Sequence, residues 1–211
     1  PQARRIKLAD VRAQLPADEP VVTEALRASQ LAEREQHIDV LVNNAGLGTG
    51  GAFDKMSVVD WDRTIDINTR SPLFLTQALL GLLKARATVD APSSVIFISS
   101  VAASEIFAHV MAYSTSKKAV EHLTPQIALA LADDHIRVNA IAPGRFFSEM
   151  TRGAWQDPEA ESYKAELQRL PAHRYGDMHD IAGVAILLCS RAGAYFTGEV
   201  LNVDGGHRLR R

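Results

Sequence analysis

The chain has 211 residues, of which 46% are hydrophobic and 23% are charged, and its formal net charge is −2 at pH 7. This length and composition suit one globular α/β domain with a sizeable core, and the charge excludes the basic surface that nucleic-acid binding needs. The single Cys189 excludes an intrachain disulfide and a cysteine-rich metal site. No apolar stretch is long enough to span a membrane and no signal-peptide pattern opens the sequence, so we expect a cytoplasmic protein without metal, nucleic-acid or membrane partners.

The first part of the chain is predicted to form a helix followed by a buried strand. Residues 1–17 show no clean period, and a helical pattern then runs from Val21 to Gln36. The short apolar run Ile38 to Val42 is typical of a parallel strand covered on both faces. Asn43-Asn44-Ala45-Gly46 comes directly after it. Small residues there let a ligand approach the backbone, although the same motif is also common as a plain turn.

A long helix is expected from Val58 to Arg86. Ser57 is its candidate N-cap, with Asp60 in a capping-box position. Pro72 should disturb the helix locally, because proline lacks a backbone N–H. Asn68 lies inside the helix, where an amide is mildly unfavourable, so it is either a solvated or capping residue or a functional one.

Strands and helices alternate through the rest of the chain. Further strands are expected at 95–98, 136–141 and 199–203, and helices at 113–133, with Pro125 inside it, and at 180–190. Residues 145–175 are polar and irregular, and we expect them to form a substrate lid. The alternation predicts one α/β domain over residues 1–211, built on a doubly wound parallel sheet.

The most informative stretch runs from Ser100 to Lys117. Tyr113 and Lys117 are four residues apart and therefore share a helix face. A lysine ammonium beside a phenol favours the phenolate, so we expect it to lower a phenol pKa that is ordinarily about 10. Ser100 follows the apolar run Val95 to Ile98 and so falls at the carboxyl end of a strand, where open α/β sheets bind ligands. A hydroxyl, a phenol and a cation in this arrangement predict an acid/base site, although Y-x-x-x-K alone is frequent by chance.

Together with L-V-N-N-A-G at residues 41–46, this stretch resembles the short-chain dehydrogenase/reductase family, and the resemblance covers most of the chain. It implies a Rossmann-like fold and reversible hydride transfer between a nicotinamide cofactor and a small-molecule carbonyl or alcohol substrate. By this resemblance, Ser100 would hold the carbonyl oxygen and Tyr113 would donate the proton. Lys117 would lower the pKa of Tyr113 and hold the ribose hydroxyls. Asn68 would hold a helix kink and seat a water of the proton relay.

The resemblance also implies a binding site for NADP or NAD, with NADP preferred. N-N-A-G would border the nicotinamide-side ribose, and the segment after Pro-Gly would fold over the nicotinamide. The residues expected at the cofactor are Asp18, Asn43, Ala45, Gly46, Tyr113, Lys117, Pro143, Gly144 and Ser148. Ser148 stands where the family usually has threonine, which keeps the hydroxyl.

One family feature is missing. The glycine-rich turn T-G-x-x-x-G-x-G, which receives the dinucleotide phosphates, does not occur before Asn43, so the first βαβ portion of the fold is absent from this sequence. Three explanations stay open: the sequence omits part of a normal enzyme, the protein is naturally short and inactive, or residues 1–17 join pieces of the missing region. We expect the first, because an intact Ser-Tyr-Lys site has little use without a hydride source.

Two segments carry a finer resemblance. Residues 142–152 and 192–206 resemble 3-oxoacyl (β-ketoacyl) reductases of the rhamnolipid-synthesis type, which implies a 3-oxoacyl thioester or a similar ketone, while a sugar or steroid alcohol stays open. In the family, the two long helices pair across a dimer interface and the C-terminal segment often completes a tetramer, so we expect a homodimer or homotetramer. The alternative is a non-catalytic scaffold or oligomer partner that has lost cofactor binding.

Overall fold

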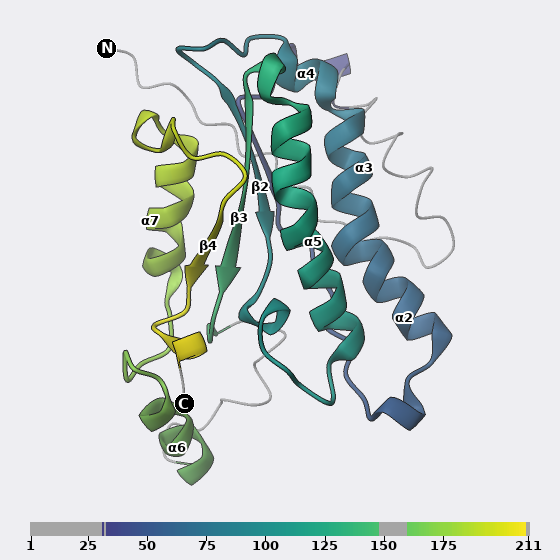
Figure 1. The fold of residues 1–211 in the computed structure, drawn as a ribbon, viewed down its shortest axis with the longest axis vertical. Coiled ribbons are helices and arrows are strands. Elements are labelled where there is room, and N and C mark those ends of the chain that lie inside the picture. The colour runs from purple at the N-terminus through teal and green to yellow at the C-terminus, as the bar shows by residue number, and fades with distance from the viewer. Residues whose placement is uncertain (1–30, 32, 148–159, 210–211) are drawn as a thin grey trace.

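The computed structural model describes Leu31 and residues 33–147 and 160–209. Several sequence predictions lie outside these residues: the segment 1–17, Asp18, most of the helix predicted from Val21 to Gln36, and Ser148. The described part is organised around one four-stranded sheet with helices on both faces (Figure 1).

All four strands of the sheet are parallel and adjacent in chain order. They are β1 (Val40–Asn43), β2 (Ser93–Ile98), β3 (Ile136–Pro143) and β4 (Val200–Val203). Parallel neighbours need long crossover connections, and the helices supply them. The central strands β2 and β3 are buried along almost their whole length, as their continuous apolar runs predict. The predicted α/β fold with a doubly wound parallel sheet is therefore confirmed.

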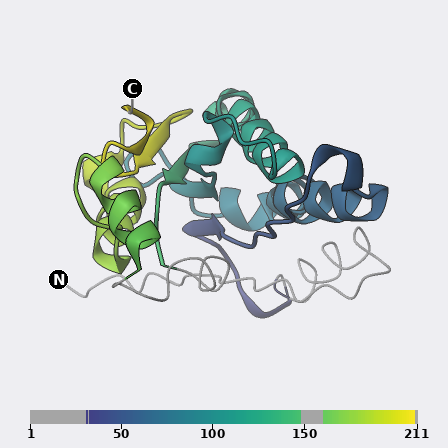
Figure 2. The same ribbon diagram turned by 90° about the horizontal axis from the view of Figure 1, so that it is seen from below.

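Helices cover the sheet in two layers (Figure 2). One layer holds α3 (Ser71–Ala78), α4 (Leu80–Lys84) and α5 (Met111–Ala130), preceded by α2 (Val58–Ile65) and a π-helical turn at Asp66–Arg70. The other layer is α7 (Met178–Cys189), and α6 (Glu161–Arg169) lies beyond the carboxyl ends of the strands (Figure 1). Short 3-10 turns occupy Phe53–Lys55, Val101–Ala103, Ala132–Asp134, Arg191–Gly193 and His207–Leu209.

Side chains of the central strands alternate between the two layers. Val95 and Phe97 of β2 pack in the core beneath α3, α4 and α5, whereas Ile96 between them packs beneath α7 with Leu188. This alternation is the two-residue period of a strand. A slip of one residue would exchange the two sets, so the two cores fix the register of the sheet and the level at which each strand ends.

The long helix predicted from Val58 to Arg86 is interrupted. Its N-cap is as predicted, since the Ser57 hydroxyl accepts a backbone N–H of the first turn at 3.0 Å. The π-helical turn at Asp66–Arg70 separates α2 from α3. Pro72 accounts for this turn, because it has no N–H to give to the carbonyl four residues earlier.

The structure also differs from the sequence predictions at β2 and in the segment 145–175. β2 begins at Ser93 rather than at Val95, because buried serine hydroxyls find backbone carbonyls: Ser93 donates to Leu83 at 2.8 Å and Ser94 donates to Leu188 at 3.1 Å. The segment 145–175 is not irregular throughout, since it contains the nine-residue helix α6.

The helix that carries the Y-x-x-x-K motif is longer at its start than predicted. α5 begins at Met111, two residues before Tyr113, and ends at Ala130. It continues through Pro125, which lies against Gly198: a Cβ on this glycine would be 3.5 Å from the Pro125 Cα. Gly198 has φ +81°, a conformation that favours glycine, so the proline and the glycine together let the segment before β4 pack closely on α5.

Arg137 of β3 is a buried cation that fastens the segment after α7. Its side chain is 7% exposed, and burial lowers its pKa. Its Nη1 donates to the carbonyls of Gly193 at 2.8 Å and Phe196 at 3.2 Å, and its Nη2 donates to the Leu188 carbonyl at 2.7 Å. The carbonyls at a helix C-terminus have no partner within the helix, so this arginine caps α7 and ties it to the sheet.

Replacing Arg137 with methionine should destabilise the protein. The substitution keeps the apolar stem but leaves three carbonyls without their charged donor, and we expect a loss of about 3 kcal/mol in the free energy of unfolding. Urea unfolding followed by circular dichroism measures it. Lys118→Met, which removes an exposed cation from α5, is the control and should change stability little. Equal stability of the two variants would contradict the capping role.

Candidate active site

The carboxyl ends of three strands bring the predicted residues together. β1 ends at Asn43, β2 at Ile98 and β3 at Pro143, so the segments that follow them meet at one edge of the sheet. The Asn43 amide donates to the Thr76 hydroxyl at 3.1 Å, which turns this side chain toward α3. Ala45 is half-buried. A Cβ on Gly46 would lie 3.5 Å from the Lys117 Nζ, which places the N-N-A-G turn against α5.

Lys117 and Tyr113 lie one turn apart on α5, as predicted. The Lys117 Nζ is 5.7 Å from the centre of the Tyr113 ring, and it donates to the Ile98 carbonyl at 2.8 Å. The lysine is only 3% exposed, and burial lowers its pKa from 10.5 to about 8. A buried ammonium with so low a pKa is typical of functional sites.

The pKa of Tyr113 differs from the expectation. It is raised above 10.0, because burial of the phenol disfavours the phenolate more than a hydrogen bond from Ser100 favours it. The predicted net lowering of the Tyr113 pKa is therefore wrong for this structure, because burial outweighs any effect of the lysine. The lowering effect of Ser100 on this pKa indicates that its hydroxyl lies near the phenol, as the predicted site requires. The Ser100 hydroxyl also accepts the Ala102 N–H at 3.2 Å, which fixes the turn after β2.

Asn68 is held at the centre of a hydrogen-bonded network. Its side-chain oxygen accepts the Leu47 N–H at 2.7 Å, and its side-chain nitrogen donates to the Leu47 carbonyl at 2.8 Å. The same nitrogen donates to the Ser116 hydroxyl at 2.9 Å. Asn68 is buried within the π-helical turn, so the predicted helix irregularity is present at this residue. The relay water implied by the resemblance stays a prediction.

Sequence reasoning missed two serines that support these residues. Ser116 donates to the Tyr113 carbonyl at 2.7 Å, and so links Asn68 to the turn of α5 that carries the phenol. Ser99 donates to the Lys117 carbonyl at 3.3 Å and to Glu121 at 3.1 Å, and so fixes the end of β2 against α5. The available signal was the position of each serine beside a candidate, in Ser99-Ser100 and Ser116-Lys117.

The predicted Pro-Gly turn is a point of close backbone approach. A Cβ on Gly144 would lie 2.6 Å from the Asp204 Cα, a distance that no side chain can occupy. Pro143 ends β3 opposite Val203, and the Gly144 N–H donates to the Val203 carbonyl at 2.8 Å. The turn therefore lies beside the C-terminal end of the sheet. The two remaining cofactor candidates, Asp18 and Ser148, are outside the described residues.

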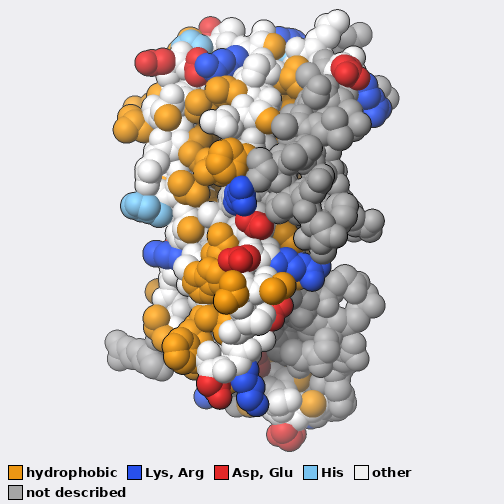
Figure 3. All heavy atoms as spheres, turned by 90° about the vertical axis from the view of Figure 1, so that its right-hand side faces the viewer, with side chains coloured by type: hydrophobic (Ala, Val, Ile, Leu, Met, Phe, Trp, Pro, Cys, Tyr) orange, Lys and Arg blue, Asp and Glu red, His pale blue; other side chains and the backbone are white. Residues whose placement is uncertain are grey.

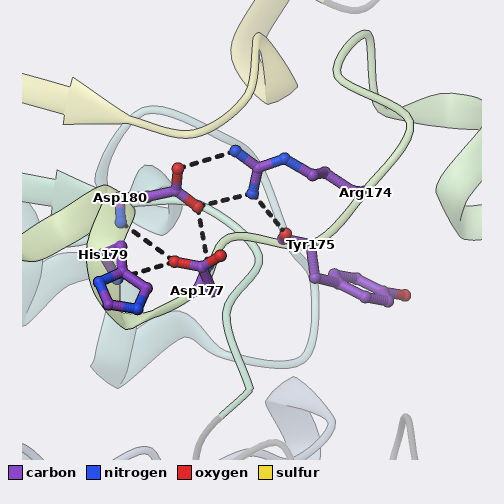
Figure 4. A network of polar contacts seen from close by, with 5 residues as sticks. All are labelled: Arg174, Tyr175, Asp177, His179 and Asp180. Atoms are coloured by element: carbon purple, nitrogen blue, oxygen red, sulfur yellow. Dashed lines mark hydrogen bonds and ion pairs between the residues drawn. The ribbon is translucent and has the colours of Figure 1, made fainter.

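A polar network fastens the end of the predicted lid to α7 (Figure 4). Arg174 forms a two-pronged pair with Asp180, at 2.6 and 2.7 Å, which holds the pKa of that carboxyl below its usual range. Asp180 in turn accepts the Asp177 N–H at 2.8 Å, while Asp177 accepts the His179 N–H at 2.7 Å. This capping box starts α7 at Met178 rather than at the predicted Asp180.

The ring of Tyr175 points away from that network (Figure 4). It meets the rings of Phe147 and Tyr163 edge-on, with centres 5.2 and 5.1 Å apart. These aromatic residues come from the segment after Gly144, from α6 and from the end of the lid. The predicted lid region therefore has an aromatic cluster in which Tyr175 is buried, Tyr163 is half-buried and Phe147 is exposed.

Comparison with known families agrees with this fold. The family described as Enoyl-(Acyl carrier protein) reductase matches residues 18–208. The chain belongs to the short-chain dehydrogenase/reductase family, and by class it is an NAD(P)-dependent oxidoreductase, as its motifs predict.

Individual relatives refine the comparison. The Rhamnolipids biosynthesis 3-oxoacyl-[acyl-carrier-protein] reductase of Pseudomonas aeruginosa is 40% identical over 197 residues, which are 92% of this chain and 76% of that protein. Dehydrogenase/reductase SDR family member 4 of Homo sapiens is 37% identical over 171 residues, 80% of this chain and 59% of that protein. The chain thus spans less than two thirds of the human relative.

Solved structures give the same result. The Pseudomonas aeruginosa RhlG/NADP active-site complex matches with a TM-score of 0.85 and 37% identity, over 92% of this chain and 75% of that one. A gluconate 5-dehydrogenase from Burkholderia cenocepacia in complex with NADP and tartrate matches with a TM-score of 0.82 and 28% identity. The match covers 93% of this chain and 74% of that one. The predicted family, fold and resemblance to reductases of the rhamnolipid type are confirmed.

Among the described residues, none of the helices combines the length and apolar character that crossing a bilayer requires. Within the described ranges, no group of three or more His, Cys, Asp and Glu side chains is arranged to hold a metal ion. Cys189 is half-buried near Arg137, and burial raises its thiol pKa, which disfavours the reactive thiolate.

The low pKa of Lys117 predicts a pH-dependent contribution to stability. Between pH 8 and 10.5 the unfolded chain holds this proton and the folded protein has released it, so stability rises with pH in that window. The difference in free energy of unfolding between wild type and Lys117→Met should grow by about 3 kcal/mol across it, in favour of wild type. Urea unfolding at a series of pH values measures the difference. The matched variant Lys118→Met should show no such trend, and a flat difference for Lys117→Met would contradict the burial of a charged ammonium.

Proposed function

We propose that the chain reduces the ketone of a 3-oxoacyl thioester with NADPH, through Ser100, Tyr113 and Lys117. The observation that carries the proposal is the placement of these three side chains at the carboxyl edge of the sheet, with Ser100 at the end of β2 and a buried Lys117 one turn from Tyr113 on α5. Relatives named as 3-oxoacyl-[acyl-carrier-protein] reductases, from Pseudomonas aeruginosa and Aquifex aeolicus, support the substrate class.

The residues at this edge fit the nicotinamide half of the cofactor. Gly46 and Gly144 present backbone without side chains, and at Gly144 a side chain would be impossible. In this proposal Lys117 holds the ribose hydroxyls, Ala45 and Gly46 border the ribose, and Pro143 and Gly144 lie against the nicotinamide ring. Solved structures of relatives with NADP bound support NADP as the cofactor. When bound, the nicotinamide supplies the hydride.

The side chains of the chain itself handle the substrate oxygen and its proton. Ser100 donates a hydrogen bond to the carbonyl oxygen and orients it toward the phenol. Tyr113 gives its proton to that oxygen as hydride reaches the carbonyl carbon, and an alcohol results. The raised pKa of Tyr113 keeps the phenol protonated at neutral pH, which is the form that reduction requires. Lys117 favours the phenolate left behind, because its charge lies next to the ring.

The supporting groups keep this geometry fixed. Asn68 joins the loop after β1 to Ser116, and Ser116 is bonded to the backbone of Tyr113. We assign Asn68 the positioning of this turn and the seat of the relay water. The segment 145–175, with α6 and its aromatic cluster, serves as the substrate lid, and apolar rings there suit an acyl chain.

We also propose that the protein is a homodimer in the cytoplasm. Figure 3 shows hydrophobic side chains gathered along one side of the molecule. The exposed apolar side chains on or beside the helices of one layer include Phe53, Val58, Val59, Phe74 and Leu129. Apolar surface of this kind favours association, and the family pairs these helices. Ile186 and Tyr195, exposed on and after α7, would support a tetramer.

The competing function is a non-catalytic oligomer partner that has lost cofactor binding. The same exposed apolar face favours it. A titration with NADPH and NADH that follows nicotinamide fluorescence separates the two. Binding supports the reductase, whereas an intact oligomer without binding supports the partner.

Tyr113→Phe tests the proposed acid. It removes the hydroxyl and keeps the ring, so kcat for NADPH-dependent reduction of a 3-oxoacyl thioester should fall about 100- to 10,000-fold while NADPH affinity changes little. Loss of absorbance at 340 nm measures the rate. Tyr195→Phe changes a fully exposed tyrosine in the same way and should leave kcat unchanged. A fully active Tyr113→Phe variant would contradict the assignment of Tyr113 as the acid. An enzyme that reduces other ketones but no 3-oxoacyl thioester would contradict the proposed substrate class only.

Leu129→Asp tests the proposed dimer. Leu129 is 81% exposed on α5, so a carboxylate there is harmless to a monomer but costly inside an apolar interface. Light scattering after gel filtration should give a dimer for wild type and a monomer for this variant. Val89→Asp, at an exposed position outside the helices, is the matched control. A variant that keeps the wild-type mass would place the interface elsewhere.

A further inference from the structure

The loop between Ser100 and Tyr113 has little structure of its own. We call residues 104–110 the substrate loop, because it joins the two side chains proposed to hold the substrate oxygen. It contains neither strand nor helix, and Ile106 at its centre is 99% exposed. A loop of this kind moves readily unless other elements hold it. The contacts that hold this loop in place should therefore affect substrate binding.

Backbone hydrogen bonds fix only the two ends of the substrate loop. At its start, the N–H groups of Ser104 and Glu105 donate to the Val101 carbonyl at 2.9 and 3.1 Å. At its end, the Gly51 N–H donates to the His109 carbonyl at 2.8 Å. The middle of the loop is held through side chains.

Glu105 is held by a buried histidine from the end of the chain. The His207 Nε2 lies 3.1 Å from the Glu105 Oε1, and His207 is only 1% exposed. Glu105 keeps 21% of its side chain exposed. Burial of an imidazole is costly unless polar partners meet it, so the contact with Glu105 matters to both residues.

His207 belongs to a rigid corner at the end of the sheet. We call residues 204–207 the C-terminal corner. The Asp204 carboxylate accepts the Gly206 N–H at 3.0 Å, and the Asp204 carbonyl accepts the His207 N–H at 3.0 Å. Gly205 and Gly206 have positive φ, of +57° and +82°, which favours glycine. The histidine is therefore presented from a turn whose shape is fixed locally.

The C-terminal corner also contacts the other two segments around the site. Asp204 packs on Gly144, which leaves no room for a Cβ there. The Gly205 carbonyl accepts the Ala172 N–H at 3.0 Å, just after α6. The corner thus touches the Pro-Gly turn, the end of the proposed lid and the substrate loop.

A second contact joins the same three segments. The Arg145 guanidinium lies 5.8 Å from the centre of the Phe107 ring, and its Nε lies 3.1 Å from Glu166 of α6. Arg145 follows Gly144, Phe107 is in the substrate loop and Glu166 is in the lid helix. The side chains on either side of the exposed Ile106 are therefore each contacted by a nitrogen group from outside the loop.

We propose that His207 and Glu105 are a positioning pair, which fixes the substrate loop to the C-terminal corner and thereby sets substrate affinity. Glu105 lies in the substrate loop and His207 in the C-terminal corner, and neither belongs to the helix that carries Tyr113 and Lys117, so the pair acts on the loop and not on proton transfer. The effect on affinity rests on the proposed reductase function, whereas the effect on the loop does not.

The experiment compares two replacements of the histidine. His207→Phe fills the space without a polar atom, and His207→Gln keeps a nitrogen donor. For His207→Phe, KM for the 3-oxoacyl thioester should rise about tenfold while kcat and NADPH affinity stay within about threefold. His207→Gln should restore most of the loss. Arg208→Met, next in the chain and exposed, is the control.

A second readout does not need activity. Chymotrypsin cleaves after Phe107, and mass spectrometry identifies the products. The loop should be cut about tenfold faster in His207→Phe than in wild type or His207→Gln, at equal thermal stability of the remainder. Glu105→Gln combined with His207→Phe should be cut no faster than His207→Phe alone, because the two changes break one interaction.

Each result bears on a different claim. Unchanged cleavage after Phe107 in His207→Phe would overturn the positioning pair, whatever the enzyme does. Faster cleavage together with a tenfold fall in kcat and an unchanged KM would overturn the effect on substrate affinity. A wild type that reduces no ketone would defeat the proposed function, while the cleavage result still decides whether the pair holds the loop.

Discussion

The burial of one ammonium group, that of Lys117, constrains the whole active edge. A cation that is 3% exposed needs a nearby acceptor, and the Ile98 carbonyl at the end of β2 provides it at 2.8 Å. That contact requires α5 to pass close to the end of β2, and Ser99 strengthens it by donating to the Lys117 carbonyl. Because Tyr113 lies one turn earlier on the same helix, the position of α5 also places it near Ser100.

A backbone irregularity supplies the second support. Pro72 removes one donor from the helix that follows β1, and the π-helical turn at Asp66–Arg70 is the consequence. The turn presents Asn68 inward, where its amide bonds both backbone groups of Leu47 and the Ser116 hydroxyl. Through Asn68, the π-helical turn thus links the loop after β1 to α5, the helix that carries the candidate acid.

Local patterns made much of this predictable. The spacing of Tyr113 and Lys117 depends only on the helical repeat, and the position of Ser100 only on where an apolar strand ends. The sign of the pKa change at Tyr113 was not predictable, because burial depends on the packing of distant segments. For the same reason the sequence did not reveal His207, whose partner Glu105 lies half the chain away. The sequence did not predict that Ser93 and Ser94 belong to β2, because their hydrogen-bond acceptors are carbonyls of other elements.

In the proposed reaction, the two shifted pKa values set the protonation state in which the site begins at neutral pH. A phenol whose pKa is raised keeps its proton, and reduction consumes that proton, whereas oxidation must begin from the phenolate. The cation that would favour the phenolate has a pKa of about 8, so it loses its charge as the pH rises toward the range in which the phenol could ionise. The lysine therefore assists the phenolate best below pH 8, where that phenolate is formed by proton transfer to the substrate. In the proposed reaction, burial thus keeps Tyr113 protonated before the proton transfer, and the adjacent Lys117 ammonium favours the phenolate after it.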